Sequence, residues 1–508
     1  MDRKVRILIV AIVVVALAYP AAAWLLGSWV ERQWGESEQH FAEQAAYLNI
    51  VKRDYRRGVY SSTEEVTYRV VGSAILKTLR TPGEADWLDH MQFTLRNRIH
   101  HGPLPELRAF APATVDTEIV LPPEVRAKLT AALGDKGALT IHTRMKWFGG
   151  GTTLIKSAAF EVPMPQGGEF ASRGVDARVE YGRDYGSQSI TFDSPGFSLK
   201  DATNSVTFGR LKLNSEMQRA FDVWGIGTLH FTLADLAIDN QVKDFKLTLQ
   251  SMVLDTKSQL AGEYVDSGFI LSTGALSTGT LETPKFAASR LNYEIHLDHV
   301  HGPSAAALTH TLRAARAEVV TSSPPADIRS KILEAFKTSG IDILARNPVL
   351  DVQHTGFTTP DGELILSIKA ALPGVTRADL EVNPQLLIPS LIKFLQIAAD
   401  VRIDTALLDK LLDTSGKGDT ITAQLQGLQR QGYLKLDGKA LTTHLAFQSG
   451  HLKINDLPFP PMPAAMPGGP GGPGVPGGPL APGMPGGPGM RGVPPAMPGT
   501  PRAPGAPH

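Results

Sequence analysis

The sequence predicts a mainly β protein: a β-rich α+β chain with one N-terminal transmembrane helix and an elongated antiparallel-sheet body. Apolar residues occupy every second position in Thr228–Ile238, Asp244–Leu249 and Leu291–Leu297, which is the period of a strand with one buried and one solvated face. Turn signals such as Pro360-Asp361-Gly362 and Asp437-Gly438 separate similar segments. This combination favours antiparallel pairing.

The same patterns predict the remaining elements. Further strands are expected at Glu363–Ala370, Tyr433–Leu436, Thr442–Phe447 and His451–Ile454. Helical spacing predicts covering helices at Pro123–Leu133, Ser304–Val319, Ala326–Lys337, Leu386–Ala399 and Thr405–Leu412. The helices are too few to enclose a large sheet.

Composition excludes several classes of function. The chain has 508 residues, with 50 Lys+Arg against 50 Asp+Glu. At about 150 residues per domain it holds two or three domains. The zero net charge provides no basic field for nucleic acid. The absence of cysteine excludes disulfides, thiolate metal sites and cysteine nucleophiles.

The N-terminus carries a membrane signal. Ile7–Val30 contains no charged residue and follows Arg3, Lys4 and Arg6. As a helix it would be about 36 Å long, enough to cross a bilayer core of about 30 Å. We therefore expect a cytoplasmic flank at residues 1–6 and a transmembrane anchor at residues 7–30, with the rest of the chain outside the cytoplasm.

A cleavable signal peptide is the alternative for this segment. Ala21-Ala22-Ala23 has the small-residue pattern of a cleavage site. Against cleavage, Trp24-Leu25-Leu26 continues the apolar run past the cut. Either form is exported. Residues 31–50 lack proline and have helical spacing, so we expect a juxtamembrane helix there.

An internal repeat divides the exported part. Met91–Pro103 aligns without a gap on Leu291–Pro303, and both segments end in His-Gly-Pro. A Pro-Pro helix start follows each, at Pro122 and at Pro324. We interpret this as a duplicated strand–turn–helix–strand unit, with a first β-rich unit at 51–290 and a second at 291–457.

The C-terminal segment 458–508 differs from the rest. It has 18 Pro and 14 Gly in 51 residues. Such a composition cannot bury a core, and we expect a disordered, solvated polyproline-II tail.

No catalytic or metal motif emerges. His100, His101, His299 and His301 end the two repeated strands, and a pseudo-two-fold arrangement could bring them to one metal. We prefer the simpler interpretation, in which each histidine bonds the backbone of its turn. We therefore expect no enzyme, no cofactor and no metal.

Three stretches carry a resemblance to a known family. Tyr55–Ser62 (YRRGVYSS), the run His101-Gly102-Pro103-Leu104-Pro105 and the ending Phe447–Asn455, together with the N-terminal anchor, resemble the YdgA-like proteins of Gram-negative bacteria. The resemblance implies a single-pass inner-membrane protein with a periplasmic body and no assigned activity. The Gly/Pro-rich tail departs from the family pattern.

We interpret Arg57-Gly58 and His101-Gly102-Pro103 as turns that set strand register. In all, ten motif positions have no assigned role. They are Arg57, Gly58, Ser61, Ser62, His101, Gly102, Pro103, His301, Gly302 and Pro303.

The sequence thus predicts a non-enzymatic protein of the cell envelope, held in the inner membrane by residues 7–30, that binds lipid or another apolar ligand on an amphipathic sheet. The alternative is a periplasmic scaffold that acts through strand edges, self-association or the Pro-rich tail, with a second copy or other envelope proteins as partners.

Overall fold

A computed structural model describes most of the chain before the Gly/Pro-rich tail. The described residues are 3–44, 48–70, 92–107, 109–120, 139–163, 167–222, 224–321, 328–381, 389–415 and 418–459. In the N-terminal helix, side chains are described from Ala18 to Gln39. The predicted helix at Pro123–Leu133 and the tail from Pro460 onward lie outside the described residues.

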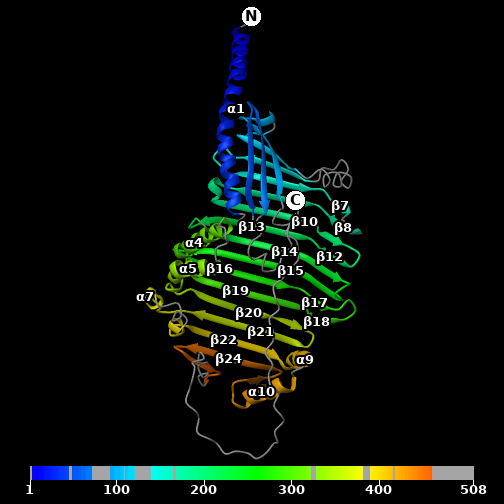
Figure 1. The fold of residues 1–508 in the computed structure, drawn as a ribbon, viewed down its shortest axis with the longest axis vertical. Helices are drawn as coiled ribbons and strands as arrows, with labels where there is room; N and C mark the ends of the chain where they lie inside the picture. Colours follow the sequence, from blue (N-terminus) through cyan, green and yellow to red (C-terminus); the bar gives the residue numbers. More distant parts are fainter. Residues whose placement is uncertain are drawn as a thin grey trace, which may run out of the picture. The chain divides into compact units, whose positions relative to one another are not determined.

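The described strands form one antiparallel sheet (Figure 1). Its main ladder runs, each strand beside the next, through β1 (Leu48–Arg57), β2 (Ser61–Val70), β3 (Gln92–His101), β4 (Ala113–Val120), β5 (Thr140–Met145), β6 (Gly151–Ser157), β9 (Val175–Tyr181), β10 (Ser187–Ser194), β13 (Leu211–Ala220), β14 (Trp224–Asn240), β15 (Phe245–Ala261), β16 (Tyr264–Thr273), β19 (Arg290–His301), β20 (Val349–Thr359), β21 (Gly362–Ala371), β22 (Gln396–Asp404), β24 (Ala440–Gln448), β25 (His451–Ile454) and β26 (Leu457–Pro458).

Two long strands, β14 and β15, carry a side branch of the sheet. Each has 17 residues, and each pairs with different neighbours along its two halves. The branch consists of β7 (Phe160–Pro163), β8 (Glu169–Ser172), β11 (Phe197–Lys200), β12 (Asn204–Phe208), β17 (Leu276–Gly279) and β18 (Pro284–Ala288), while β23 (Lys435–Asp437) pairs with β24.

In the described part of the chain, helices are fewer than strands. They are α1 (Arg3–Gln44), α4 (Gly302–Thr321), α5 (Ile328–Ala335), a π turn η5 (Phe336–Gly340), α6 (Ile341–Leu344), α7 (Arg377–Leu380), α9 (Thr405–Ser415) and α10 (Gly418–Arg430), with short 3₁₀ turns η2 (Pro105–Leu107) and η4 (Arg183–Tyr185). The mainly β, antiparallel prediction is confirmed.

The helices predicted from the sequence differ from the structure at three places. Leu386–Ala399 is not one helix, because β22 begins at Gln396, where Ile397 and Ala399 join the sheet. The helix predicted over residues 31–50 ends at Gln44, and β1 begins at Leu48. Helix α10 was not predicted, although Ile421, Leu425 and Leu428 have helical spacing.

The repeated strands end in similar junctions but are followed by different elements. The His101 amide donates to the Tyr60 carbonyl at 3.0 Å, and His301 pairs with Tyr264. In the first copy only the short turn η2 separates the His-Gly-Pro turn from strand β4, whereas in the second copy α4, α5 and α6 precede β20. Residue 290 was the predicted boundary between the two β-rich units. Strand β16, which precedes this boundary, pairs with β19, so the sheet is continuous across it.

Among the described residues, no helix is long and apolar enough to cross a membrane. The side chains of residues 7–17, the first half of the predicted anchor, lie outside the described ones.

The second half of that predicted anchor packs against the sheet. Val30 is buried with Ile99 of β3, Ala113 and Val115 of β4, and Met145 of β5. Helix α1 is therefore a covering element of the sheet from about Tyr19 onward.

Candidate functional site

Two of the motif positions, Ser62 and His101, meet in the structure. Ser62 Oγ lies 3.1 Å from His101 Nε2, and both residues are buried beneath α1. His101 Nδ1 lies 2.9 Å from the main-chain oxygen of Ala23. A carbonyl only accepts, so Nδ1 donates to Ala23 and Nε2 accepts from the serine hydroxyl. Burial lowers the pKa of His101, which favours this neutral form.

The other first-copy motif positions shape the same end of the sheet. The Gly58 amide donates to the Ser61 carbonyl at 2.9 Å and closes the β1–β2 turn. Gly102 has a φ of 136°, a conformation that favours glycine, and its amide donates to Pro112 across the loop that begins with Pro103. The Arg57 guanidinium lies 5.0 Å from the Trp24 ring centroid, so it contacts α1.

The second-copy positions lie at the start of α4. His301 Nδ1 lies 2.7 Å from Ser304 Oγ, and Gly302 and Pro303 begin α4. The Gly302 amide donates to the Glu263 carbonyl at 2.8 Å. Each histidine thus joins a strand end to a helix. No group of three or more histidine, aspartate or glutamate side chains in the described part of the chain could hold a metal.

Sequence reasoning missed a pair of buried carboxyl groups. Glu38 of α1 and Glu64 of β2 are both buried. Trp34 Nε1 lies 3.1 Å from Glu38 Oε1 and 2.7 Å from Glu64 Oε2. Arg53 Nε lies 2.6 Å from Glu64 Oε1 and 3.3 Å from Glu38 Oε2. Asn97 Nδ2 donates to Glu64 at 3.0 Å.

The charges in this cluster do not balance. Two carboxyl groups face one guanidinium, and burial, followed by the charge of Glu64, raises the pKa of Glu38 to about 8. Folding therefore favours the protonated form of Glu38. The alternation Ser62, Glu64, Val66 on one face of β2 was the available signal, because it places a carboxyl group among inward-facing residues.

Both buried groups attach α1 to the sheet. His101 contacts Ser62 and Ala23, while Trp34 contacts Glu64 and Asn97 contacts Glu38. The Ser62, His101, Glu38 and Glu64 side chains are buried between α1 and the sheet, whereas the Arg53 side chain is 33% exposed. Their chemistry is that of a helix-docking site.

The face that α1 covers continues across the sheet as an uncharged row. Paired residues of adjacent antiparallel strands lie on the same face. From Ser62 the row of partners passes through Ile99, Val115, Thr143, Thr153, Val179, Ile190, Ser215, Leu229, Thr256, Phe269, Ile295, Val352, Ile368, Ala399, Leu445 and Ile454. We call this side of the sheet the apolar face.

The opposite side, the charged face, has the complementary row. Its successive partners are Glu180, Ser189, Glu216, Thr228, Lys257, Gly268, His296, Asp351, Lys369, Ala398, Ala446 and Lys453. Cross-strand histidine–aspartate contacts such as His230–Asp255 (2.6 Å) and His444–Asp400 (2.7 Å) lie on this face. It has the composition of a solvated surface.

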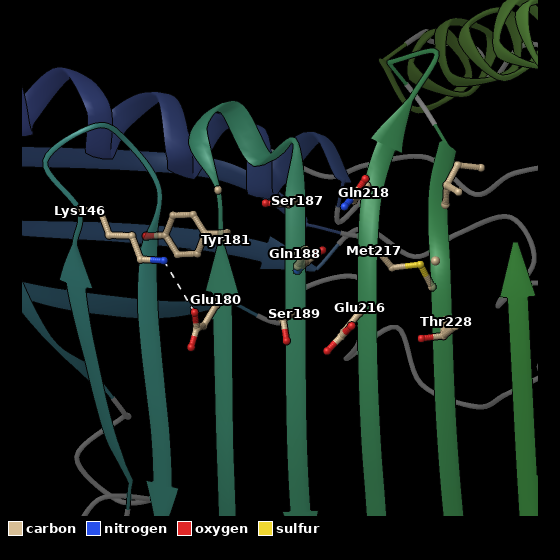
Figure 2. Close-up of a pocket in the computed structure, with 13 residues that line it drawn as sticks. Lys146, Glu180, Tyr181, Ser187, Gln188, Ser189, Glu216, Met217, Gln218 and Thr228 are labelled. Atoms are coloured by element: carbon tan, nitrogen blue, oxygen red, sulfur yellow. Dashed lines mark ion pairs between the residues drawn. The ribbon is translucent and has the colours of Figure 1, made fainter. Parts of the chain in front are cut away.

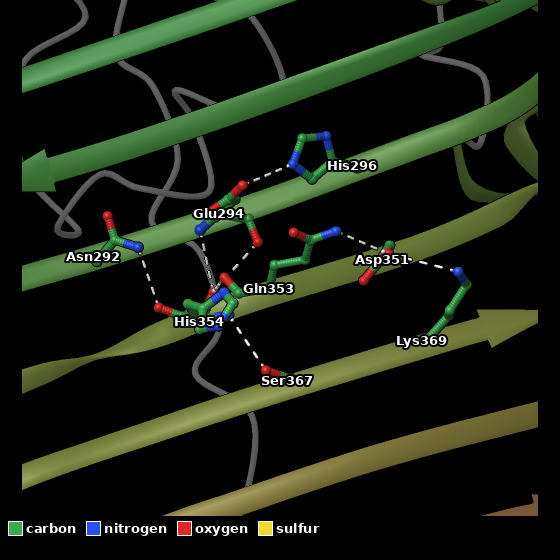
Figure 3. Close-up of polar contacts among 9 residues, drawn as sticks. Asn292, Glu294, His296, Asp351, Gln353, His354, Ser367 and Lys369 are labelled. Carbon is green, nitrogen blue, oxygen red and sulfur yellow. Dashed lines mark hydrogen bonds and ion pairs between the residues drawn. The ribbon is translucent and has the colours of Figure 1, made fainter.

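Figure 3 shows the charged face where β20 is irregular. His354 has a φ of 44° at a register shift, and its amide lies 3.3 Å from Ser367 Oγ. Val352 pairs with Ile368 and Phe357 pairs with Leu364, so between these two pairs β20 has one residue more than β21. The bulge therefore keeps the apolar face continuous across β20.

Comparison with known proteins gives a family. Residues 1–462 match a bacterial protein family of unknown function, DUF945. The chain belongs to this family. No curated protein and no solved structure matches the chain.

The DUF945 match includes every described residue and ends at residue 462. It therefore covers helix α1 and the whole described sheet. Nearly all of the Gly/Pro-rich tail lies outside it.

Figure 2 shows a broad hollow of about 510 Å³ in the described sheet of this DUF945 protein. Glu180, Ser189, Glu216 and Thr228 of the charged row line it. Lys146 Nζ lies 3.7 Å from Glu180 Oε2 at its rim. Tyr181 and Met217 also line the hollow, so its lining mixes charged, polar and apolar side chains.

Proposed function

We propose that this DUF945 protein carries lipid acyl chains, or apolar ligands of similar shape, on the apolar face of its sheet. The observation that carries the proposal is the exposure of that face beyond α1. Phe269, Tyr293, Leu297 and Leu350 are 36% to 41% exposed, although they point to the same side as the buried Ile99 and Val115. The apolar face is covered by α1 at one end and open to a ligand further along.

The two faces of the sheet differ in how favourably they would bind an acyl chain. Half-exposed aliphatic and aromatic side chains in adjacent strands form a surface without charge, and each strand adds about 4.8 Å to it. An acyl chain lying across the strands would remove this surface from water. The charged face opposes such binding because its ion pairs would lose their solvent.

The proposal includes a membrane anchor in the N-terminal part of α1. Its support is the uncharged run that begins at Ile7, behind Arg3, Lys4 and Arg6. The sheet then lies on the periplasmic side of the inner membrane. An anchored sheet with an open apolar face would receive its ligand from the bilayer.

A photocrosslinking experiment tests acyl-chain binding. The full chain is purified in mild detergent with a phosphatidylethanolamine that bears a diazirine near the end of one acyl chain. After irradiation, labelled peptides are identified by mass spectrometry. We expect labels in β16, β19, β20 and β21. Labels confined to residues 3–30 would show only lipid around the anchor and would overturn the proposal.

A pair of variants on neighbouring strands provides the control. Leu350→Glu places a carboxylate on the apolar face, and Lys369→Glu places one on the charged face. We expect Leu350→Glu to reduce labelling of the sheet about tenfold, because a carboxylate cannot contact an acyl chain without loss of solvation. Lys369→Glu should label like the unmodified chain. Equal loss in both variants would contradict binding on one face.

A further inference from the structure

The end of the sheet beside Tyr19 and Trp24 carries an unusual set of exposed apolar side chains. Trp24, Leu25, Val59, Tyr60 and Leu104 are 42% to 63% exposed. We call these five residues the collar. They come from α1, the β1–β2 turn and the loop after β3, so distant segments of the chain bring apolar groups to one end of the sheet.

Direct contacts hold the collar together around the helix. The Tyr19 hydroxyl donates to the Leu104 carbonyl at 2.8 Å, and the Tyr19 and Tyr60 rings stack with centroids 6.1 Å apart. Arg57 packs its guanidinium on Trp24 and lies 3.5 Å from Glu31. The collar is thus fixed to the part of α1 at which the helix leaves the sheet (Figure 1).

The number of α1 residues before the collar determines how far the collar would lie from the membrane. A bilayer core of about 30 Å requires about 20 helical residues. Counted from Ile7, the first residue after the basic flank, such a span ends at Leu26. Tyr19 lies seven residues, or about 10 Å, before that end. A span that stopped at Tyr19 would be too short.

We propose that the collar enters the interfacial region of the lipid bilayer, so that this end of the sheet is seated in the membrane rather than held above it. The inference rests on the proposed anchor and adds the residues through which the sheet contacts lipid. Trp and Tyr side chains prefer this boundary, and helices lie about 5–10 Å deep in it. Arg57 beside Trp24 places a cation at the level of the lipid phosphates.

The absence of cysteine makes a site-specific test direct. Val59→Cys and Leu104→Cys provide single labelling sites in the collar for an environment-sensitive NBD fluorophore. Val242→Cys is the matched control, because Val242 is an exposed valine in the turn between β14 and β15. Each full-length variant is reconstituted into vesicles of phosphatidylethanolamine and phosphatidylglycerol, with or without a lipid that carries a nitroxide in its headgroup region.

We expect the labels at both collar sites to shift to shorter emission wavelengths and to be quenched by the nitroxide lipid, while the label at Val242→Cys is unaffected. Collar labels as exposed to water as the control, in a chain that floats with the vesicles, would overturn the collar and leave the anchor in place. A chain that does not float would overturn the anchor and the collar together. Acyl-chain binding on the sheet is tested separately by the crosslinking experiment.

Discussion

Glu38 on α1 and Glu64 on β2 share one indole donor, with Trp34 Nε1 at 3.1 Å from the first carboxyl group and 2.7 Å from the second. The two residues are 26 positions apart in the sequence. Their contact places a protonatable group at the junction between the helix and the sheet. Docking of α1 is consequently coupled to pH.

The contribution of Glu38 to stability should fall as the pH rises from about 4.5 to about 8. In this window the folded chain holds a proton on Glu38, whose pKa is about 8, whereas the unfolded chain releases it near 4.5. The native state then binds more protons, so a rise in pH lowers the free energy of unfolding, by about 1 kcal/mol per pH unit. Glu38→Gln should remove this contribution, as measured by denaturant unfolding across the pH range. If the free energy of unfolding depended on pH in the same way in the unmodified chain and in Glu38→Gln, the prediction would be contradicted.

Gly27→Ala should destabilise the chain by about 1–3 kcal/mol. A Cβ at Gly27 would lie 2.7 Å from His101 Cε1, and that ring is held at both nitrogens. Gly427→Ala in α10 is the matched control, since its Cβ meets nothing within 4 Å. This control should gain about 0.5–1 kcal/mol from helix propensity. Denaturant unfolding should give opposite signs for the two variants, and equal signs would argue against close docking of α1.

Ser62→Ala should cost about 1–3 kcal/mol, because it leaves His101 Nε2 buried without its donor. Ser61→Ala removes a hydroxyl from the neighbouring exposed position and should change stability by less than about 0.5 kcal/mol. Protease cleavage of α1 under native conditions reports the same contact. Equal protection of the two variants would show that the Ser62 hydroxyl does not hold the helix.

The mature chain should retain Ala23. Its carbonyl is the acceptor for buried His101 Nδ1, and Tyr19 stacks on Tyr60. Cleavage after Ala23 would remove both contacts and leave the imidazole unpaired. The intact mass of the chain extracted from membranes decides the matter. A mass that begins at Trp24 would favour the signal-peptide alternative.

Much of the sheet could be predicted because alternation is a local property. Thr228–Ile238 and Leu291–Leu297 lie within β14 and β19, and the turn at Asp361-Gly362 connects β20 to β21. A period of two needs only neighbouring residues to be visible. The segment at Leu386–Ala399 failed because its apolar residues fit both periods, and pairing of Ile397 and Ala399 with β21 selected the strand.

Less of the candidate site could be predicted from the sequence. The motifs around Ser62 and His101 were visible, but their hydrogen bond joins residues 39 positions apart and depends on α1 lying above both. Nothing local indicates that Glu64 faces Glu38. The predicted anchor also gave no sign that Val30 belongs to the core of the sheet.

The sequence by itself determined the strand-rich class, the antiparallel hairpins, the N-terminal apolar run and the distinct Gly/Pro-rich tail, because periodicity and composition act over short stretches of chain. Only the tertiary structure decided which face of the sheet is apolar from strand to strand, where α1 covers it, and that Ser62, His101, Glu38 and Glu64 hold that helix. These features arise from contacts between distant residues, whose energies depend on burial and pairing that no local pattern records.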